Sequence, residues 1–201
     1  MKSQTLIALK FLVVMTVLTG LIYPVVMTGI AQLSFPSKAN GSLIIKDGKI
    51  IGSELLGQKF YSTIYFWSRP SAVNYNPSPS GASNYGPTSD TLKKLVNSRR
   101  ELFAKANSVT DISSIPKEMI FASGSGLDPH ISPEAALMQV DRIVKARNFT
   151  ENQKSMLLSE IKANSLKPQF NFLGEPRINV LQLNMILDNI GEDHNFKLGK
   201  K

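Results

Sequence analysis

Three side chains that together could cleave an ester or amide bond stand close to one another in Gly124–Pro133, which reads GSGLDPHISP: Ser125, Asp128 and His130. A serine becomes a nucleophile when a histidine takes its proton and a carboxylate orients that histidine. Serine hydrolases place the nucleophile in G-x-S-x-G, however, and here the order is S-G-S-G. The base of a triad normally approaches from another element. We therefore favour a structured turn with a satisfied histidine over a hydrolase.

The glycines of the same stretch suggest a different chemistry, the binding of an anion. Gly124, Ser125 and Gly126 approach the G-x-G-x-x-G pattern of nucleotide-binding loops. Pro129 stands where the third glycine would pack against a helix, so the match is incomplete. A glycine turn ahead of a helix N-terminus could still hold an anion.

Basic side chains offer two further interpretations. Arg142 and Arg147, with Lys145 between them, could bind phosphate, but we favour a charged outer helix face. The whole chain carries 23 Lys and Arg against 15 Asp and Glu, a net charge of +8. Its densest basic cluster lies along an expected helix and is formed by Lys93, Lys94, Arg99 and Arg100. A solvated helix face explains this cluster, and we expect no nucleic-acid partner.

Metal and thiol chemistry have little support in the composition. The 201 residues include no cysteine and two histidines, which excludes a disulfide scaffold, a thiolate zinc site and a cysteine nucleophile. Asp128 and His130 would need a third ligand to hold a metal, and none is evident. The chain also lacks a phosphate-loop motif and the Asp-Lys-Thr-Gly run of a phosphorylated aspartate. We expect a non-catalytic chain with no metal and no cofactor of its own.

A membrane anchor is the clearest element. Residues 11–30, FLVVMTVLTGLIYPVVMTGI, are uncharged and long enough to cross a hydrocarbon core of about 30 Å. A cleaved signal peptide would have a shorter apolar region closed by small residues, so we favour an uncleaved anchor. We expect a short cytoplasmic tail at 1–10, a soluble domain at 36–190 and a polar C-terminal tail at 191–201. Lysines on both sides leave the orientation open by charge, and an exported domain is the commoner arrangement.

Strand signals come first in the soluble part. Residues 42–52 contain two β-branched runs around Asp47-Gly48 and predict a hairpin. Phe60–Trp67 (FYSTIYFW) and Glu118–Ala122 (EMIFA) predict two more strands. Asn74–Thr88 is rich in proline and glycine and predicts a long loop, either functional or a plain surface excursion.

Helix signals dominate afterwards, so the expected class is α+β: a single transmembrane helix followed by one mixed domain with a small sheet and several helices. Apolar spacing predicts a helix over Thr88–Ala106. Three later helices are expected to begin at Ser132 with Pro133, at the capping box of Thr150 and Gln153, and at Asn179. The positions expected to face inward are Ala136, Val140, Ile143 and Val144 after Ser132, and Met156, Leu157 and Ile161 after Thr150.

Ordered motifs over nearly the whole chain resemble the C subunits of the bacterial Kdp potassium-transporting ATPase, the KdpC family. One of these motifs is Gly124–Pro133 itself. The others are Thr19-Gly20, Tyr23-Pro24, Asn40–Ile44, Tyr65-Phe66, Arg69–Ala72, Asn76-Pro77, Ser80-Gly81, Ser83-Asn84, Gln139-Val140, Arg142, Ala146-Arg147, Gly174–Arg177 and Asn179–Leu181.

The resemblance implies an accessory subunit of an ATP-driven, high-affinity potassium uptake complex in the bacterial inner membrane. Its partners would be a channel-like potassium-binding subunit, a P-type ATP-hydrolysing subunit, a small single-helix subunit and membrane lipid. In this family the C subunit is described as a catalytic chaperone that raises the affinity of the pump for ATP. ATP would then be encountered through the complex.

Residue roles also follow from the resemblance. Gln139 matches a glutamine proposed as a nucleotide contact, and with Gly124, Ser125 and Gly126 it would form a direct nucleotide-binding module, the alternative function. An exported domain cannot reach cytoplasmic ATP, so we favour an allosteric effect on ATP affinity. The motif residues expected at structural or partner contacts are Arg69, Pro70, Ser71, Asn84, Asp128, Arg142, Arg147, Glu175 and Asn179.

Overall fold

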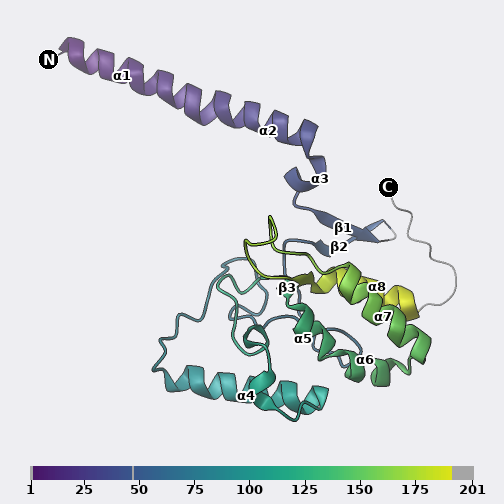
Figure 1. Cartoon of the computed structure of the whole chain (residues 1–201). Coiled ribbons are helices and arrows are strands. Elements are labelled where there is room, and N and C mark those ends of the chain that lie inside the picture. Colours follow the sequence, from purple (N-terminus) through teal and green to yellow (C-terminus); the bar gives the residue numbers. More distant parts are fainter. Residues whose placement is uncertain (1, 47, 192–201) are drawn as a thin grey trace. The chain divides into compact units, whose positions relative to one another are not determined.

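The structure is a computed structural model that describes residues 2–46 and 48–191 (Figure 1). The chain divides into two compact units, Met1–Ser53 and Glu54–Lys201, and each is described by itself. The expected polar tail at 191–201 lies outside the described residues from 192 onward.

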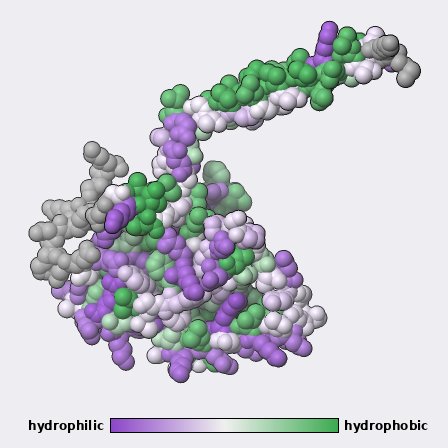
Figure 2. All heavy atoms as spheres, turned by 180° about the vertical axis from the view of Figure 1, so that it is seen from behind, coloured by the Kyte–Doolittle hydropathy of each residue, from purple (hydrophilic) through white to green (hydrophobic). Residues whose placement is uncertain are grey.

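The first unit begins with a long apolar helix. It comprises α1 (Lys2–Val17), a π-helical turn (Leu18–Ile22) and α2 (Tyr23–Ser34). Ser3–Ser34 is long and apolar enough to cross a membrane, and an 18-residue window within it has a mean hydropathy of 2.3. Figure 2 shows the hydrophobic surface along this helix. The expected apolar helix is thus present and extends beyond 11–30 at both ends.

The π-helical turn lies where the anchor meets Pro24. Proline has no N–H group, and its ring collides with the carbonyl four residues earlier in a regular helix. Here Pro24 lies in the first turn of α2, and the N–H of Tyr23 donates to the carbonyl of Leu18, five residues back. The wider turn keeps the helix continuous through the proline.

A β-hairpin completes the first unit. After α3 (Pro36–Ala39), β1 (Leu43–Lys46) pairs with β2 (Lys49–Ser53) in antiparallel register, with a bulge between Ile44 and Ile45. The predicted strands are therefore confirmed, whereas Asp47 of the predicted turn lies outside the described residues.

The second unit is mainly helical, and the α+β class is confirmed. Its α-helices are α4 (Asp90–Asn107), α5 (Pro133–Leu137), α6 (Val140–Arg147), α7 (Glu151–Ala163) and α8 (Val180–Gly191), with 3-10 turns at Ile112–Ser114 and Lys117–Met119. Helix α7 packs against α5, α6 and α8 (Figure 1). A two-stranded antiparallel sheet joins β3 (His130–Ile131) to β4 (Ile178–Asn179).

The helix starts were correctly predicted from capping residues. The side chain of Ser132 accepts from the N–H of Ala135, with Pro133 in the first turn of α5. Thr150 and Gln153 form the reciprocal capping box of α7. Asn179 accepts from the N–H of Gln182 at 3.1 Å and so caps α8. A local side-chain signal was sufficient in each case because it satisfies N–H groups that the helix itself leaves unpaired.

Two predicted strands are wrong. Phe60–Trp67 is an irregular segment, because its buried backbone groups bond to side chains and not to a neighbouring strand. Glu118–Ala122 follows Pro116 into a 3-10 turn, in which the N–H groups of Ile120 and Phe121 both donate to the carbonyl of Lys117.

Two helix details also differ from the predictions. The helix that Ser132 starts is interrupted at Met138 and Gln139, which separate α5 from α6. Met156 is 54% exposed, so the expectation that it faces inward was wrong, whereas Leu157 and Ile161 are buried as expected. The buried face of α7 is narrower than its apolar residues suggested, because the neighbouring helices cover only one side of α7.

Candidate functional site

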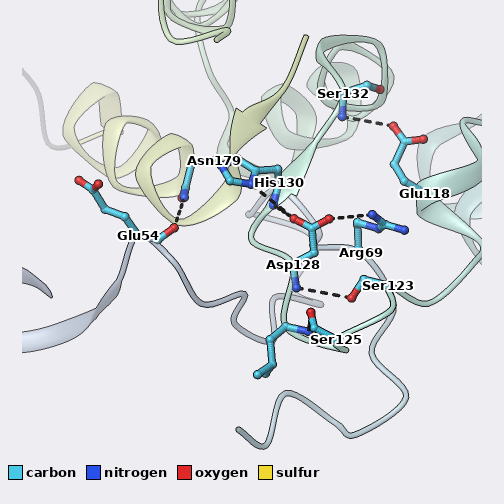
Figure 3. Close-up of polar contacts among 10 residues, drawn as sticks. Glu54, Arg69, Glu118, Ser123, Ser125, Asp128, His130, Ser132 and Asn179 are labelled. Atoms are coloured by element: carbon cyan, nitrogen blue, oxygen red, sulfur yellow. Dashed lines mark hydrogen bonds and ion pairs between the residues drawn. The ribbon is translucent and has the colours of Figure 1, made fainter. Parts of the chain in front are cut away.

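Asp128 is the centre of a polar network around Gly124–Pro133 (Figure 3). Its Oδ1 accepts from the N–H of His130 at 3.0 Å, an Asx turn that carries the chain into β3. Its Oδ2 accepts from Arg69 Nη1 at 2.7 Å. Its own N–H donates to Ser123 Oγ at 3.5 Å. The carboxylate therefore joins the motif to a segment about sixty residues earlier.

The electrostatics hold Asp128 in its ionised form. Burial by itself would raise its pKa, but the hydrogen bonds from His130 and the positive charge of Arg69 outweigh that effect and lower the pKa to about 2. A carboxylate with so low a pKa is unsuited to general acid or base work near neutral pH. Its chemistry is that of a fixed anion that orients its neighbours.

The structure does not assemble a serine triad from the motif. Ser125 Oγ accepts from the N–H of Leu127 at 3.1 Å, which makes it part of the turn. His130 Nδ1 lies 3.4 Å from Asp128 Oδ1, and within the described ranges no hydrogen bond joins Ser125 to His130. Among those residues there is also no cluster of three or more groups that could hold a metal ion.

The glycine turn is held against the long loop that precedes α4. The N–H of Gly81 donates to the carbonyl of Ser125 at 2.9 Å. Gly126 has a φ of +71°, and a Cβ there would lie 2.6 Å from Val73 Cγ2. Gly126 thus allows the two segments to approach closely, whereas a Cβ on Gly124 would meet no atom within 4 Å.

This contrast predicts the effect of adding a methyl group at each glycine. Gly126→Ala should lower the free energy of unfolding by about 1–3 kcal/mol, because it combines a strained positive φ with overpacking. Gly124→Ala, the matched control, should change it by less than about 0.5 kcal/mol. Denaturant unfolding of the full-length chain in detergent, followed by circular dichroism, measures both. Equal stability of the two variants would contradict the close packing at Gly126.

A second prediction concerns acid stability. The pKa of Asp128 is lower in the folded chain than its ordinary value of 3.8, so its contribution to stability is present above that value and is lost as pH falls toward 2. At neutral pH Asp128→Asn should therefore cost about 1–2 kcal/mol, allowing for a side chain that is 31% exposed.

The same measurement at pH 2.5 should find the gap between native chain and variant largely closed. Asp141→Asn provides the control, since Asp141 pairs with Lys154 but is 81% exposed. A gap that stays constant from pH 6 to pH 2.5 would show that the charge of Asp128 is not what stabilises the turn.

Gln139 is fully buried, at 0% exposure, in the turn between α5 and α6. Its Oε1 accepts from the N–H of Trp67 at 2.7 Å and from Arg142 Nη2 at 2.8 Å, and its Nε2 donates to the carbonyl of Ala135. No hydrogen bond within the described ranges joins it to Gly124, Ser125 or Gly126. In this conformation Gln139 binds the backbone of Trp67 and Ala135 and the side chain of Arg142, and not solvent.

Arg142 corrects one expectation, since it is 8% exposed and does not belong to an outer charged face. Its Nε donates to Asn107 Oδ1 at 2.9 Å, and its Nη1 donates to the carbonyls of Ser62 and Thr63. The guanidinium lies 4.7 Å above the ring of Trp67. Burial lowers the pKa of Arg142 to about 10, so the group is still protonated at neutral pH.

Arg147 also hydrogen-bonds to the irregular segment Phe60–Trp67. Its Nε donates to the carbonyl of Ile64 at 2.8 Å, and its Nη2 pairs with Asp188 at 2.7 Å. Its guanidinium also lies 4.9 Å from the ring of Tyr65, whose hydroxyl donates to Asp188. Neither arginine of α6 is therefore simply a solvated surface charge.

Three residues that hydrogen-bond to Arg142, to Arg147 or to the irregular segment were not identified from the sequence: Asn107, Asp188 and Asn184. Asn184 accepts from the N–H of Phe66 at 2.8 Å and donates to its carbonyl at 3.0 Å. A signal for Asn184 did exist, because it is a polar residue at helical spacing between the buried Val180 and Leu187.

The remaining motif residues have structural or exposed positions. The carbonyl of Pro70 accepts from Ser123 N–H, Ser71 Oγ accepts from the N–H groups of Val73 and Tyr75, and Asn179 Nδ2 donates to the carbonyl of Glu54 at 2.8 Å (Figure 3). Asn84 adopts a positive φ in the exposed loop, and Glu175 is exposed.

Comparison with known proteins identifies the family. Residues 5–189 match the family model described as "K+-transporting ATPase, c chain". The chain belongs to the KdpC family. The "Potassium-transporting ATPase KdpC subunit" of Methylococcus capsulatus is 47% identical over 184 residues, covering 90% of this chain and 95% of that protein. The proteins of the same name from Burkholderia ambifaria and Dechloromonas aromatica are 49% and 44% identical, covering 88% and 96% of this chain and 91% and 100% of their own lengths.

The KdpC match covers both compact units. It includes almost all of the apolar helix, the hairpin and every helix of the second unit up to residue 189. The apolar helix and the polar network around Asp128 and Arg142 therefore both lie within the part of the chain that matches the family.

Proposed function

We propose that this chain is a non-catalytic accessory subunit of an ATP-driven, high-affinity potassium uptake complex in the bacterial inner membrane. The observation that carries the proposal is the family match from residue 5 to residue 189, anchor included. Relatives named as subunits of a potassium-transporting ATPase support it at 43–49% identity.

The polar network favours a scaffolding role over chemistry. Asp128 is a paired, ionised carboxylate, and Gln139 and Arg142 are buried with protein partners. Such networks fix the geometry of a surface without needing a reactive group. A subunit of this kind acts by binding one conformation of its partners better than another, and this can raise ATP affinity at a distant site.

The proposed arrangement places the N-terminus in the cytoplasm and the second unit outside it. The partners are a channel-like potassium-binding subunit, a P-type ATP-hydrolysing subunit and a small single-helix subunit, with lipid around the anchor. ATP is then bound by the hydrolysing subunit, and this chain affects its affinity allosterically.

Assembly and ATP use provide the test. The other subunits should be expressed with and without this chain, purified in mild detergent, and assayed for potassium-stimulated ATP hydrolysis over a range of ATP concentrations. We expect loss of a subunit from the complex or a several-fold rise in the KM for ATP when the chain is absent. An intact complex with unchanged KM and kcat would disprove the proposal.

The competing proposal is a direct nucleotide-binding module formed by Gly124–Gly126 and Gln139. It requires Gln139 to leave three hydrogen bonds and become exposed. Calorimetric titration of the full-length chain in detergent with ATP separates the two functions. Saturable heat that Ser125→Ala or Gly124→Ala weakens would support the module, and no heat at millimolar ATP would exclude it.

A further inference from the structure

A trough lies between α4 and the long loop that precedes it, and it is called here the α4 trough. It consists of two adjoining hollows with volumes of about 480 and 510 Å³. Tyr85, Leu92 and Phe121 line both hollows. Each hollow is as large as many ligand sites, so a bound group could fill it.

The helical spacing of α4 directs its cations to this side. Lys93, Asn97 and Arg100 are separated by four and three residues, which places them on one helix face, and all three line the first hollow. Leu95 and Arg99 form the neighbouring stripe and line the second hollow. Three of the basic residues of α4 therefore line the trough.

The positive charge of the trough is not compensated by its own lining, which includes no aspartate or glutamate. Arg99 and Arg100 are half-buried and form no ion pair with any residue that the structure describes. Arg99 Nη1 donates to the carbonyl of Ile120 at 3.2 Å. Lys93 pairs with Asp90, whose side chain is 85% exposed. A ligand that complements this charge has to be acidic.

Apolar side chains provide a second kind of contact in the α4 trough. Val96 lines the first hollow and is 7% exposed, whereas Leu95 and Phe121 are each 38% exposed and Tyr85 is 45% exposed. These partly exposed side chains would be covered by an apolar group of the ligand. The lining therefore fits a ligand that combines carboxylates with an apolar side chain.

The loop wall of the trough offers backbone groups as well. Residues 82–85 take part in no hydrogen bond within the described ranges, although the N–H of Gly81 donates to Ser125 and the carbonyl of Gly86 accepts from the N–H of Ser89. The loop is thus fixed at both ends of an irregular segment whose N–H and carbonyl groups can pair with another chain. Such pairing is typical of proteins that bind extended peptides.

From these three features we propose that the α4 trough binds an extended acidic segment of another protein. Carboxylates of that segment pair with Arg99 and Arg100, an apolar side chain covers Phe121, and the peptide backbone pairs with residues 82–85. A free inorganic anion would use the arginines alone. The proposal goes beyond the accessory function, because binding of such a segment requires no other subunit of the pump.

Calorimetric titration of the full-length chain in an uncharged detergent tests the proposal. The probe is the capped peptide Glu-Glu-Phe-Glu-Glu, and its matched control is Gln-Gln-Phe-Gln-Gln, which has the same shape without charge. We expect the acidic peptide to bind with a Kd of about 10–100 µM and the amide peptide to bind at least about tenfold more weakly. Replacing the central phenylalanine by alanine should also weaken binding, by about threefold or more.

Variants of α4 locate the binding to the trough. Arg100→Gln combined with Lys93→Gln should weaken binding of the acidic peptide about fivefold or more, because two partly exposed ion pairs are lost. Lys94→Gln is the control, since Lys94 belongs to the same helix but lines neither hollow. Its affinity should match that of the native chain. Circular dichroism should show all three proteins equally folded.

Three results would overturn the proposal. The first is no heat from the acidic peptide, or equal affinity for the acidic and amide peptides. The second is an equal loss of affinity in Lys94→Gln and in the double variant, which would indicate diffuse attraction by the whole helix. The third is saturable heat from inorganic phosphate but none from the acidic peptide, which would indicate a simple anion site. Each of these results would leave the proposed accessory function intact.

Discussion

Replacement of Arg142 by methionine is expected to lower the free energy of unfolding by about 2–4 kcal/mol. Methionine keeps much of the length and apolar contact of arginine but donates no hydrogen bond. The carbonyl of Thr63 and the side-chain oxygen of Asn107 would lose their donor, whereas the carbonyl of Ser62 would keep the one from Trp67 Nε1. Each buried acceptor left unpaired costs about 1–3 kcal/mol. Burial of the charged guanidinium costs free energy, and the same burial lowers the pKa of Arg142. Methionine carries no charge and does not have this cost, so part of the loss is offset.

Lys145→Met is the matched control for this prediction. It removes the same charge from the same helix, but Lys145 is exposed. Its effect should stay within about 0.5 kcal/mol. Denaturant unfolding of the full-length chain can be followed by circular dichroism, with the emission of Trp67 as a local signal beneath the guanidinium. If the two variants unfold at the same denaturant concentration, the Arg142 network does not stabilise the fold.

Several helices could be predicted because their signals are local. Ser132 with Pro133, the Thr150–Gln153 box and Asn179 each satisfy backbone groups within a few residues of themselves. The anchor and the hairpin strands were predictable for the same reason, from a continuous apolar run and from two β-branched runs. None of these features depends on a distant part of the chain.

Phe60–Trp67 shows where such local reasoning fails. Its β-branched and aromatic residues do indicate burial, and Phe66 is indeed 0% exposed. Whether a buried segment becomes a strand depends on which groups pair with its backbone. Here these groups are side chains of Gln139 and Asn184, which lie 72 and 118 residues away in the sequence. No pattern within the segment contains that information.

The candidate site was predictable to a similar extent. The position of Asp128 before a proline indicated a structured turn, and the structure has an Asx turn there. The outward face assigned to Arg142 was wrong, because the irregular segment covers that side of α6. A charge at helical spacing reveals its face only when the neighbours of the helix are known.

The companion prediction concerns Asn184, whose side chain forms both hydrogen bonds to the backbone of Phe66. Asn184→Leu keeps a similar shape but leaves the buried N–H and carbonyl of Phe66 unpaired. We expect a loss of about 3 kcal/mol, since each unpaired group costs about 1–3 kcal/mol. Asn189→Leu on the same helix is the control, because Asn189 is only partly buried. Denaturant unfolding of the two variants should differ by most of that amount.

Asn184→Asp distinguishes the hydrogen bonds from simple packing. An ionised carboxylate would accept from the N–H of Phe66 but would face its carbonyl oxygen without a proton to donate. Burial raises the pKa of such a carboxyl group, so the variant should be least stable at neutral pH. Its stability relative to the native chain should recover as pH falls and the protonated group again donates to Phe66. A deficit that does not depend on pH would mean that Asn184 contributes through shape and not through its pairing with Phe66.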